Sequence, residues 1–266
     1  MKYRDLAVVR GGGDIASGTI YRLYKSGYKV VVLEIEKPTS IRRTVSYSQC
    51  IYDREVEIEG VRAKLCKNLQ EIKKAHENYK IPVVVDPDGE TIKEIKPKIV
   101  VDAILAKKNL GTQKDMADLV IGLGPGFTAG EDVDVVVETN RGHNLGRLIY
   151  KGKAQPNTGK PGNTLGFTTE RVIYSPAEGK VKVIKDIKSS VEKEDVIAEV
   201  EGQDVKAKIS GIIRGMIQPD LRVHKGMKIG DIDPRNKIES CTIISDKARA
   251  IGGGVLEAIL HYDICR

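Results

Sequence analysis

Two glycine-rich segments hold the residues whose types and spacing best suit chemistry on an anionic ligand. The first matches the pattern G-x-G-x-x-A and lies between an apolar run and a helical pattern. A phosphate-binding turn needs that setting, because its glycines permit a tight bend and the helix start offers free N–H groups to the phosphate. The predicted ligand-binding residues of this turn are Gly11, Gly12, Gly13, Asp14 and Ala16.

A carboxylate follows where a dinucleotide-binding turn needs one. Glu34 ends the next apolar run, 18 residues after Ala16, at the place of an acid that binds ribose hydroxyls. Asp14 complicates this interpretation, since a carboxylate beside phosphates repels them unless it turns away or binds a metal. The alternative is that the glycines only form a tight strand-to-helix turn.

The second glycine-rich segment spans residues 122–130 and follows the apolar run 119–121. Its N–H groups would form an anion-binding concavity around Gly124 and Gly126, with the Thr128 hydroxyl as an additional donor. The alternative is a tight connection that the fold requires. In parallel sheets ligands bind beyond the carboxyl ends of the strands, so both glycine loops are expected to face one crevice.

Basic residues follow in segment 139–147. Arg141 and Arg147 would clamp a phosphate with paired N–H groups, and His143 would donate or relay a proton near neutral pH. Asp86 and Asp102 end two further apolar runs, where they would bind a metal or a ribose, or cap loops. The spacing identifies no catalytic residue, and the scattered His and Cys predict no metal site.

The elements that position these residues alternate between strand and helix up to about residue 150. Buried-type strands are expected at 5–9, 30–34, 82–85, 99–101 and 119–121. The first helix ends at Gly27, an exposed hairpin or edge strand covers 55–61, and Asn68 caps a helix. Ser245 caps a last helix, in which Gly252 to Gly254 permit close helix packing or, alternatively, contact with a ligand.

The second half of the chain contains an internal repeat. Gly211 lies 32 positions after Gly179, and Val223 lies 32 positions after Val191. Two such copies, joined by a hairpin at 202–204, resemble the barrel-sandwich hybrid of biotinyl and lipoyl domains. The predicted fold class is therefore α/β, with a Rossmann-like, mostly parallel domain, then a small barrel-sandwich β module and a C-terminal helix. The expected domains are residues 1–170, 171–235 and 236–266, the last packing back on the first.

Composition narrows the class of protein. Of 266 residues, 44 are Lys or Arg and 37 are Asp or Glu, which leaves a net charge of +7 with both signs interleaved. That pattern favours a solvated surface first, attraction for a small anionic ligand second and a nucleic-acid face third. No stretch reaches the roughly 20 apolar residues of a membrane-spanning helix. Residues 1–5 run straight into an apolar strand, without room for a signal peptide. A cytoplasmic location is expected.

Several motifs also carry a resemblance to a known family. Segments 10–18, 124–134, 138–147, 230–235 and 251–258 look like the selenium-dependent molybdenum hydroxylase maturation family of the YqeB type. A more distant similarity is to the xanthine dehydrogenase accessory proteins of the XdhC type. The resemblance implies a maturation factor that binds the molybdopterin cofactor, in its cytosine dinucleotide form among others, and assists its modification or delivery to a molybdenum hydroxylase client.

Two other functions stay open at this point. The first turn together with Glu34 would suit an NAD(P)-dependent oxidoreductase, with NAD(P) as the alternative cofactor. A nucleotide-sensing scaffold without chemistry would suit the same residues. The expected partners are the client protein and an anionic pterin or dinucleotide ligand, with a second copy of the chain as a further candidate. Neither nucleic acid nor a membrane is expected as a partner.

Overall fold

The computed structural model describes residues 6–159 and 162–265, so the expectations for residues 1–5 fall outside the described part. The chain divides into two compact units. Unit 1 comprises Met1–Pro38, Ser46–Asn157 and Ile244–Arg266, and unit 2 comprises Thr39–Val45 and Thr158–Ile243. The three-domain division at residues 170 and 235 stays a prediction.

Unit 1 is built on a nine-stranded sheet with the order β3-β4-β5-β2-β1-β6-β7-β8-β9. The seven inner strands, from β4 through β5, β2, β1, β6 and β7 to β8, pair in parallel with their neighbours. The edge strands β3 and β9 pair antiparallel. The carboxyl ends of β2, β1, β6, β7 and β8 therefore share one side of the sheet, here called the carboxyl edge. The strands are β1 (Leu6–Arg10), β2 (Lys29–Glu34), β3 (Glu55–Ile58), β4 (Val61–Cys66), β5 (Ile81–Val85), β6 (Ile99–Asp102), β7 (Leu119–Leu123), β8 (Val135–Val137) and β9 (Leu148–Ile149).

Helices cover both faces of this sheet. Strand β1 alternates, so that Ala7 and Val9 face α1 and α5 while Leu6 and Val8 face α3 and α4. Strands buried on both faces read as continuous apolar runs, which explains the sequence of β1 and β2. The helices are α1 (Asp14–Lys25), α2 (Cys50–Asp53), α3 (Leu69–Glu77), α4 (Glu90–Ile95) and α5 (Asp246–Ile264).

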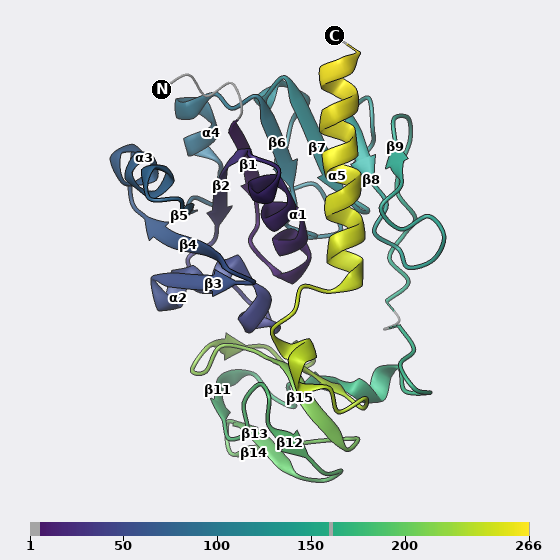
Figure 1. Cartoon of the computed structure of the whole chain (residues 1–266). Coiled ribbons are helices and arrows are strands. Elements are labelled where there is room, and N and C mark those ends of the chain that lie inside the picture. The colour runs from purple at the N-terminus through teal and green to yellow at the C-terminus, as the bar shows by residue number, and fades with distance from the viewer. Residues whose placement is uncertain (1–5, 160–161, 266) are drawn as a thin grey trace. The chain divides into compact units, whose positions relative to one another are not determined.

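Helices α1 and α5 lie side by side although more than 200 residues separate them (Figure 1). A Cβ at Gly252 would lie 2.6 Å from the backbone oxygen of Gly18, and a Cβ at Gly18 would overlap the backbone of Ala248. Gly252 of α5 and Gly18 of α1 therefore serve close packing of the two helices. The Ser245 side chain accepts the Ala248 N–H at 3.2 Å, which confirms the predicted cap.

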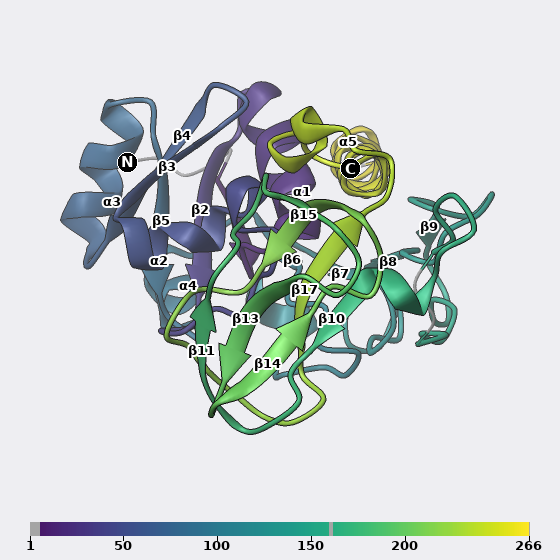
Figure 2. The same cartoon turned by 90° about the horizontal axis from the view of Figure 1, so that it is seen from below.

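Unit 2 consists of two four-stranded antiparallel sheets, β10-β17-β15-β12 and β14-β13-β11-β16. Figure 2 shows β17 between β15 and β10, and β13 beside β14. The internal repeat corresponds to β11–β13 and β15–β17, and both repeat glycines have positive φ, 153° at Gly179 and 157° at Gly211. The strands are β10 (Val172–Tyr174), β11 (Gly179–Val183), β12 (Ser190–Val191), β13 (Val196–Val200), β14 (Gln203–Lys206), β15 (Gly211–Met216), β16 (Arg222–Val223) and β17 (Lys228–Asp233).

The structure corrects the predicted fold class. The large sheet is mixed, and β6, β7 and β8 follow one another without an α-helix between them, so the strand–helix alternation of a Rossmann-like domain stops at β6. Segment 103–118 is rich in charged residues and segment 124–134 in glycine, and neither forms an α-helix. Helix α5 packs against β7 and β8 instead. The predicted barrel-sandwich hybrid of two repeats is also wrong: β10, β14 and Thr39–Val45 belong to unit 2, with Arg42 pairing to Met216.

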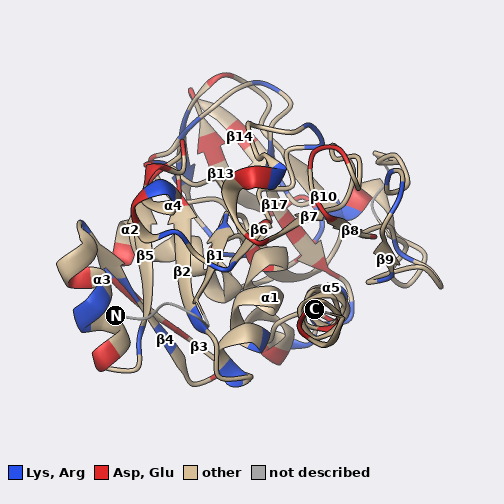
Figure 3. Cartoon of the chain, turned by 90° about the horizontal axis from the view of Figure 1, so that it is seen from above, with Lys and Arg blue, Asp and Glu red and all other residues tan. Residues whose placement is uncertain are grey.

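Charged side chains of both signs alternate along the chain, as the colours of Figure 3 show for α3. Within the described ranges, no helix combines the length and the apolar character that crossing a membrane requires.

Candidate ligand-binding site

The first glycine turn joins β1 to α1 at the carboxyl edge. Gly11 has a φ of +91°, and a Cβ there would lie 2.9 Å from the Ala103 backbone oxygen. A Cβ at Gly12 would lie 2.8 Å from the Ser48 nitrogen, and the Gly12 carbonyl accepts the Ser48 N–H at 2.8 Å. Neighbouring backbone therefore requires glycine at both positions, independently of any ligand.

Gly13 is the N-cap residue of α1 and has no side chain with which to cap it. A helix start leaves its first N–H groups without partners in the helix, and here no N-cap side chain accepts one of them. This end of α1 is therefore suited to bind an anion, as the sequence predicts for Gly13 to Ala16.

Glu34 lies at the turn, as expected, but its carboxylate contacts protein. Its two oxygens accept the N–H groups of Gly12 and Ile35, each at 2.8 Å. Burial raises the pKa of this carboxyl, although the two hydrogen bonds oppose the shift. One loop N–H that the sequence assigns to a ligand is thus occupied by the chain's own acid.

The two other predicted strand-end acids have structural contacts. Asp86 accepts the N–H groups of Gly89, Glu90 and Thr91 at the start of α4, between 2.7 and 3.0 Å. Asp102 is buried and accepts the Thr112 hydroxyl at 2.5 Å, while Arg10 Nη1 lies 3.8 Å from its Oδ2. Of the roles left open for these acids, the loop-capping one matches Asp86.

The second glycine loop is likewise filled by a carboxylate of its own. The Thr128 N–H donates to Asp132 Oδ2 at 2.7 Å, and the Thr128 carbonyl accepts the Asp132 N–H at 3.0 Å. Gly124 and Gly126 have φ values of +76° and +120°, and a Cβ at Gly126 would lie 2.8 Å from the Lys108 nitrogen. Segment 103–108 thus contacts both glycine loops and lies between them.

Arg141 and Arg147, which follow β8, contact side chains of α5 and of their own loop. Arg141 forms an ion pair with Asp246 in the first turn of α5, 3.0 Å from Nη1 to Oδ2. Arg147 Nη1 donates to the Asn144 side chain at 3.2 Å, and both Arg147 and His143 are exposed. Buried Glu138 accepts the N–H groups of Asn140 and Gln155 at 2.7 and 2.8 Å, which holds this loop.

Lys247 joins this region and is the residue that sequence reasoning missed. It follows Asp246 in α5, is partly buried, and lies within electrostatic reach of Asp14, Glu138 and Arg141. Burial lowers its pKa, the Arg141 charge adds to that shift, and the acids oppose it. The sequence indicates only that Lys247 lies in the first turn of a helix capped by Ser245. It does not indicate that this helix begins near α1, so Lys247 could not be assigned to the site.

The structure therefore brings together the start of α1, Glu34, the loop around Arg141, and Lys247. Thr128 and Arg147 have protein partners of their own in Asp132 and Asn144, and their part in anion binding stays a prediction. No group of three or more His, Cys, Asp or Glu side chains within residues 6–159 and 162–265 is arranged to hold a metal ion.

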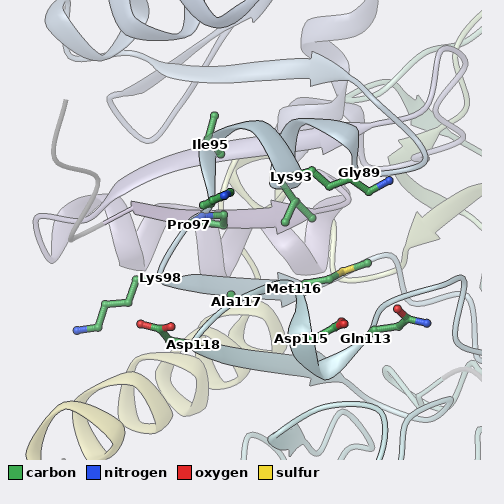
Figure 4. Close-up of a pocket in the computed structure, with 12 residues that line it drawn as sticks. Gly89, Lys93, Ile95, Pro97, Lys98, Gln113, Asp115, Met116, Ala117 and Asp118 are labelled. Atoms are coloured by element: carbon green, nitrogen blue, oxygen red, sulfur yellow. The ribbon is translucent and has the colours of Figure 1, made fainter.

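A cavity of about 1010 Å³ lies elsewhere in unit 1 (Figure 4). It is lined by α4, by residues that precede β6 and by residues that precede β7, with Ile95 and Met116 among the apolar ones and Lys96 and Asp118 among the charged. None of the predicted site residues lines it.

Comparison with known proteins gives one strong sequence match. The chain is 53% identical over 256 residues, 96% of its length, to the uncharacterized protein YqeB of Escherichia coli strain K12. It spans about half of that relative, 47% of its length. No family model matches the chain.

Solved structures align only loosely. They include the ectoine utilization protein EutE (DoeB) of Ruegeria pomeroyi, with 10% identity, a TM-score of 0.26 and 85% of each chain covered. A succinylglutamate desuccinylase of a Silicibacter species has 11% identity and a TM-score of 0.26 over 86% and 84% of the chains. An aspartoacylase family protein of Mesorhizobium loti has 11% and 0.29 over 85% and 84%. Similarity this low assigns neither fold nor activity to this chain.

These findings correct the family and function expected from the motifs. The 53% identical relative is a YqeB protein, the type that the motifs resemble, but it is itself uncharacterized, and no family model matches the chain. The expected molybdenum hydroxylase maturation function, its XdhC-type kinship and the two alternative functions are therefore set aside. The motifs misled because the loop glycines at 11 and 12 have packing reasons of their own.

Proposed function

We propose that unit 1 binds a small anionic ligand at the carboxyl edge, between the start of α1 and Lys247. The observation that carries this proposal is the convergence of a cationic side chain and an uncapped helix start. The start of α1, which has no N-cap side chain, and the Lys247 ammonium both favour negative charge in the same region.

The packing of α1 on α5 supports this arrangement. Gly18 lies one turn beyond Asp14 in α1, and it touches Ala248, the residue after Lys247. Asp14 supplies negative charge near Lys247, and the lysine would offset part of the repulsion between this carboxylate and a phosphate. A bound anion would replace part of that pairing.

Glu34 would favour ligands that carry a hydroxyl group over ligands that lack one. Each of its oxygens accepts one N–H and retains a further lone pair, which suits a hydroxyl donor such as that of a ribose. NAD(P) and a pterin dinucleotide stay predictions for the ligand, and the client protein, homo-oligomer and cytoplasmic location stay predictions as well.

The test is calorimetric titration of the full chain with NAD(H), NADP(H), cytidine diphosphate and inorganic phosphate. Lys247→Met should weaken the affinity for the ligand that binds by about tenfold, the loss expected for one charge-assisted contact. The matched control is Lys151→Met at an exposed position of the same unit, which should leave the affinity unchanged. Equal affinity in wild type and Lys247→Met, or no binding by any of these anions, would refute the proposal.

A further inference from the structure

A smaller cavity of unit 1, about 290 Å³ in volume, is lined by α1 and by the start of α5. Among the described residues, no carboxylate lines this cavity, here called the helix-pair pocket. Every polar side chain that lines it can donate a hydrogen bond, which favours a ligand rich in acceptors. These side chains belong to Tyr21, Arg22, Lys25, Ser26 and Arg249.

Positive charge exceeds negative charge at the helix-pair pocket. Arg249 is paired, because its Nη2 contacts Glu59 Oε2. The other oxygen of Glu59 accepts the Ile244 N–H at 2.7 Å, so protein groups occupy both oxygens of this acid. Arg22 and Lys25 have no carboxylate within ion-pair distance in residues 6–159 and 162–265. Three cations against one acid leave a net charge of +2.

The pocket also has more hydrogen-bond donors than the protein has acceptors for them. A guanidinium carries five N–H groups, and Arg22 uses one of them, from Nη2 to the Arg249 carbonyl oxygen at 3.3 Å. Its other N–H groups have no protein acceptor in the described part of the chain. The side-chain hydroxyls of Tyr21 and Ser26 likewise form no hydrogen bond with a described residue. An anion with several oxygens would satisfy these donors together.

Packing holds the cations in place before a ligand binds. Lys25 Nζ lies 5.7 Å from the centre of the Tyr21 ring, and Arg249 Cζ lies 5.6 Å from it. Cation–π attraction therefore positions both groups, and Glu59 fixes the arginine further. The last turn of a helix favours cations, which by itself accounts for Arg22 and Lys25. It does not account for Arg249, which α5 brings to the same pocket.

We propose that the helix-pair pocket binds the phosphate group of a small molecule through Arg22, Lys25 and Arg249. A phosphate monoester carries about −1.5 to −2 charges at pH 7, which matches the two uncompensated positive charges. A carboxylate offers oxygens to a guanidinium in the same way, with less charge, and should bind more weakly. Ligand pockets usually begin at about 300 Å³, so this one suits a phosphate with a small group attached rather than a dinucleotide.

The pocket is separate from the site at the start of α1. Lys247 is not among the residues that line it. Residues two positions apart on a helix do not face the same side, so Lys247 and Arg249 serve different surroundings. Binding at one site therefore does not require binding at the other.

The experiment is lysine acetylation of the full chain with and without inorganic phosphate, at constant ionic strength, followed by mass spectrometry. Phosphate should protect exposed Lys25 saturably, and acetate should protect it less. Exposed Lys29, at the start of β2, should react equally throughout. The same digests report Lys247, so protection of Lys247 alone would support the α1 site and overturn this one. Equal acetylation of Lys25 at every phosphate concentration would also overturn it.

Two arginine variants test whether the protection comes from this pocket. Arg22→Met should raise the phosphate concentration that half-protects Lys25 about tenfold, the loss expected for one charge-assisted contact. Arg62→Met removes an exposed arginine of the same unit, paired with Glu57, and should leave that concentration unchanged. An equal rise in both variants would show nonspecific attraction and contradict the proposal. Arg22→Lys keeps the charge without the paired N–H groups, so its concentration should fall between those of the wild type and Arg22→Met.

Discussion

At the residue scale, the carboxyl edge is a set of loops whose N–H groups are occupied by the chain's own acids. Glu34 accepts from Gly12, Asp132 from Thr128 and Glu138 from Asn140. A buried N–H must have a partner, and a nearby carboxylate is available in the folded chain without any ligand. At this edge, anion binding is therefore expected at the start of α1, where the N-cap residue Gly13 has no side chain to accept an N–H.

The titration of Glu34 should be visible in the stability of the protein. Its pKa is raised on folding by burial, so the folded state binds this proton more tightly than the unfolded state. Stability should accordingly fall as pH rises through the window that begins at the ordinary value of 4.5. Glu34→Gln should reduce this decline, as measured by urea unfolding at a series of pH values. An identical pH profile in the two proteins would contradict the assignment.

Arg10 should be one of the most sensitive positions for folding. It is 3% exposed, donates to Thr112 at 2.5 Å and to the Pro87 carbonyl at 3.1 Å, and balances buried Asp102. Arg10→Met leaves that acid without its cation and should lower the unfolding free energy by about 3–5 kcal/mol. Arg62→Met, at a solvent-exposed pair with Glu57, should cost far less. Denaturant unfolding compares the two, and equal losses would refute the reasoning.

At the element scale, the contact between α1 and α5 positions the proposed site. Glycines on both helices let the backbones approach closely, and this contact brings Lys247 toward the start of α1. Gly254 serves a similar purpose, because a Cβ there would overlap the Gly146 carbonyl of the loop that carries Arg141. The helix start, the lysine and the arginine are thus held in place by glycine contacts.

Two adjacent glycines of α5 should respond in opposite directions to alanine. Gly252→Ala places a Cβ 2.6 Å from the Gly18 oxygen and should destabilise by about 1–3 kcal/mol. Gly253→Ala meets nothing closer than the Arg22 guanidinium carbon at 3.9 Å and should stabilise by about 1 kcal/mol through helix propensity. Thermal unfolding of both variants tests this, and changes of the same sign would be inconsistent with close packing of α1 on α5.

At the scale of the whole molecule, both units are assembled from separated pieces of chain. Unit 1 is completed only by Ile244–Arg266, after the chain has traversed unit 2. Ile251, Val255 and Ile259 of α5 are fully buried in the core of unit 1. The last segment is therefore part of the core of unit 1. It covers the face of the sheet that segments 103–118 and 124–134 leave without a helix.

A chain ending at Ile243 should lose the cooperative unfolding of unit 1. Each of the three buried α5 residues contributes about 1.5–3 kcal/mol by burial, comparable in total to the stability of a typical domain. Hydrogen exchange followed by mass spectrometry should show that β1, β6 and β7 lose protection while β11–β17 keep theirs. Protection of β1 equal to that in the full chain would show that unit 1 folds without α5.

The sequence by itself determined the local structure. Apolar runs placed strands near 30–34 and 82–85, Asn68 and Ser245 capped their helices, Gly27 followed the end of α1, and the repeat marked the strands of unit 2. These signals depend on residues close in the chain, and backbone preference and periodicity express them directly.

Only the tertiary structure decided what the loops contact. It placed Glu34 on the Gly12 N–H, Asp132 on Thr128, Arg141 on Asp246 and Lys247 near Asp14. The sheet order and the cover by α5 were also beyond the sequence, which led to the wrong fold class. The physical reason is that a glycine loop offers the same N–H groups to a ligand or to a side chain. The choice between them depends on which charges the remote parts of the chain bring within hydrogen-bond distance.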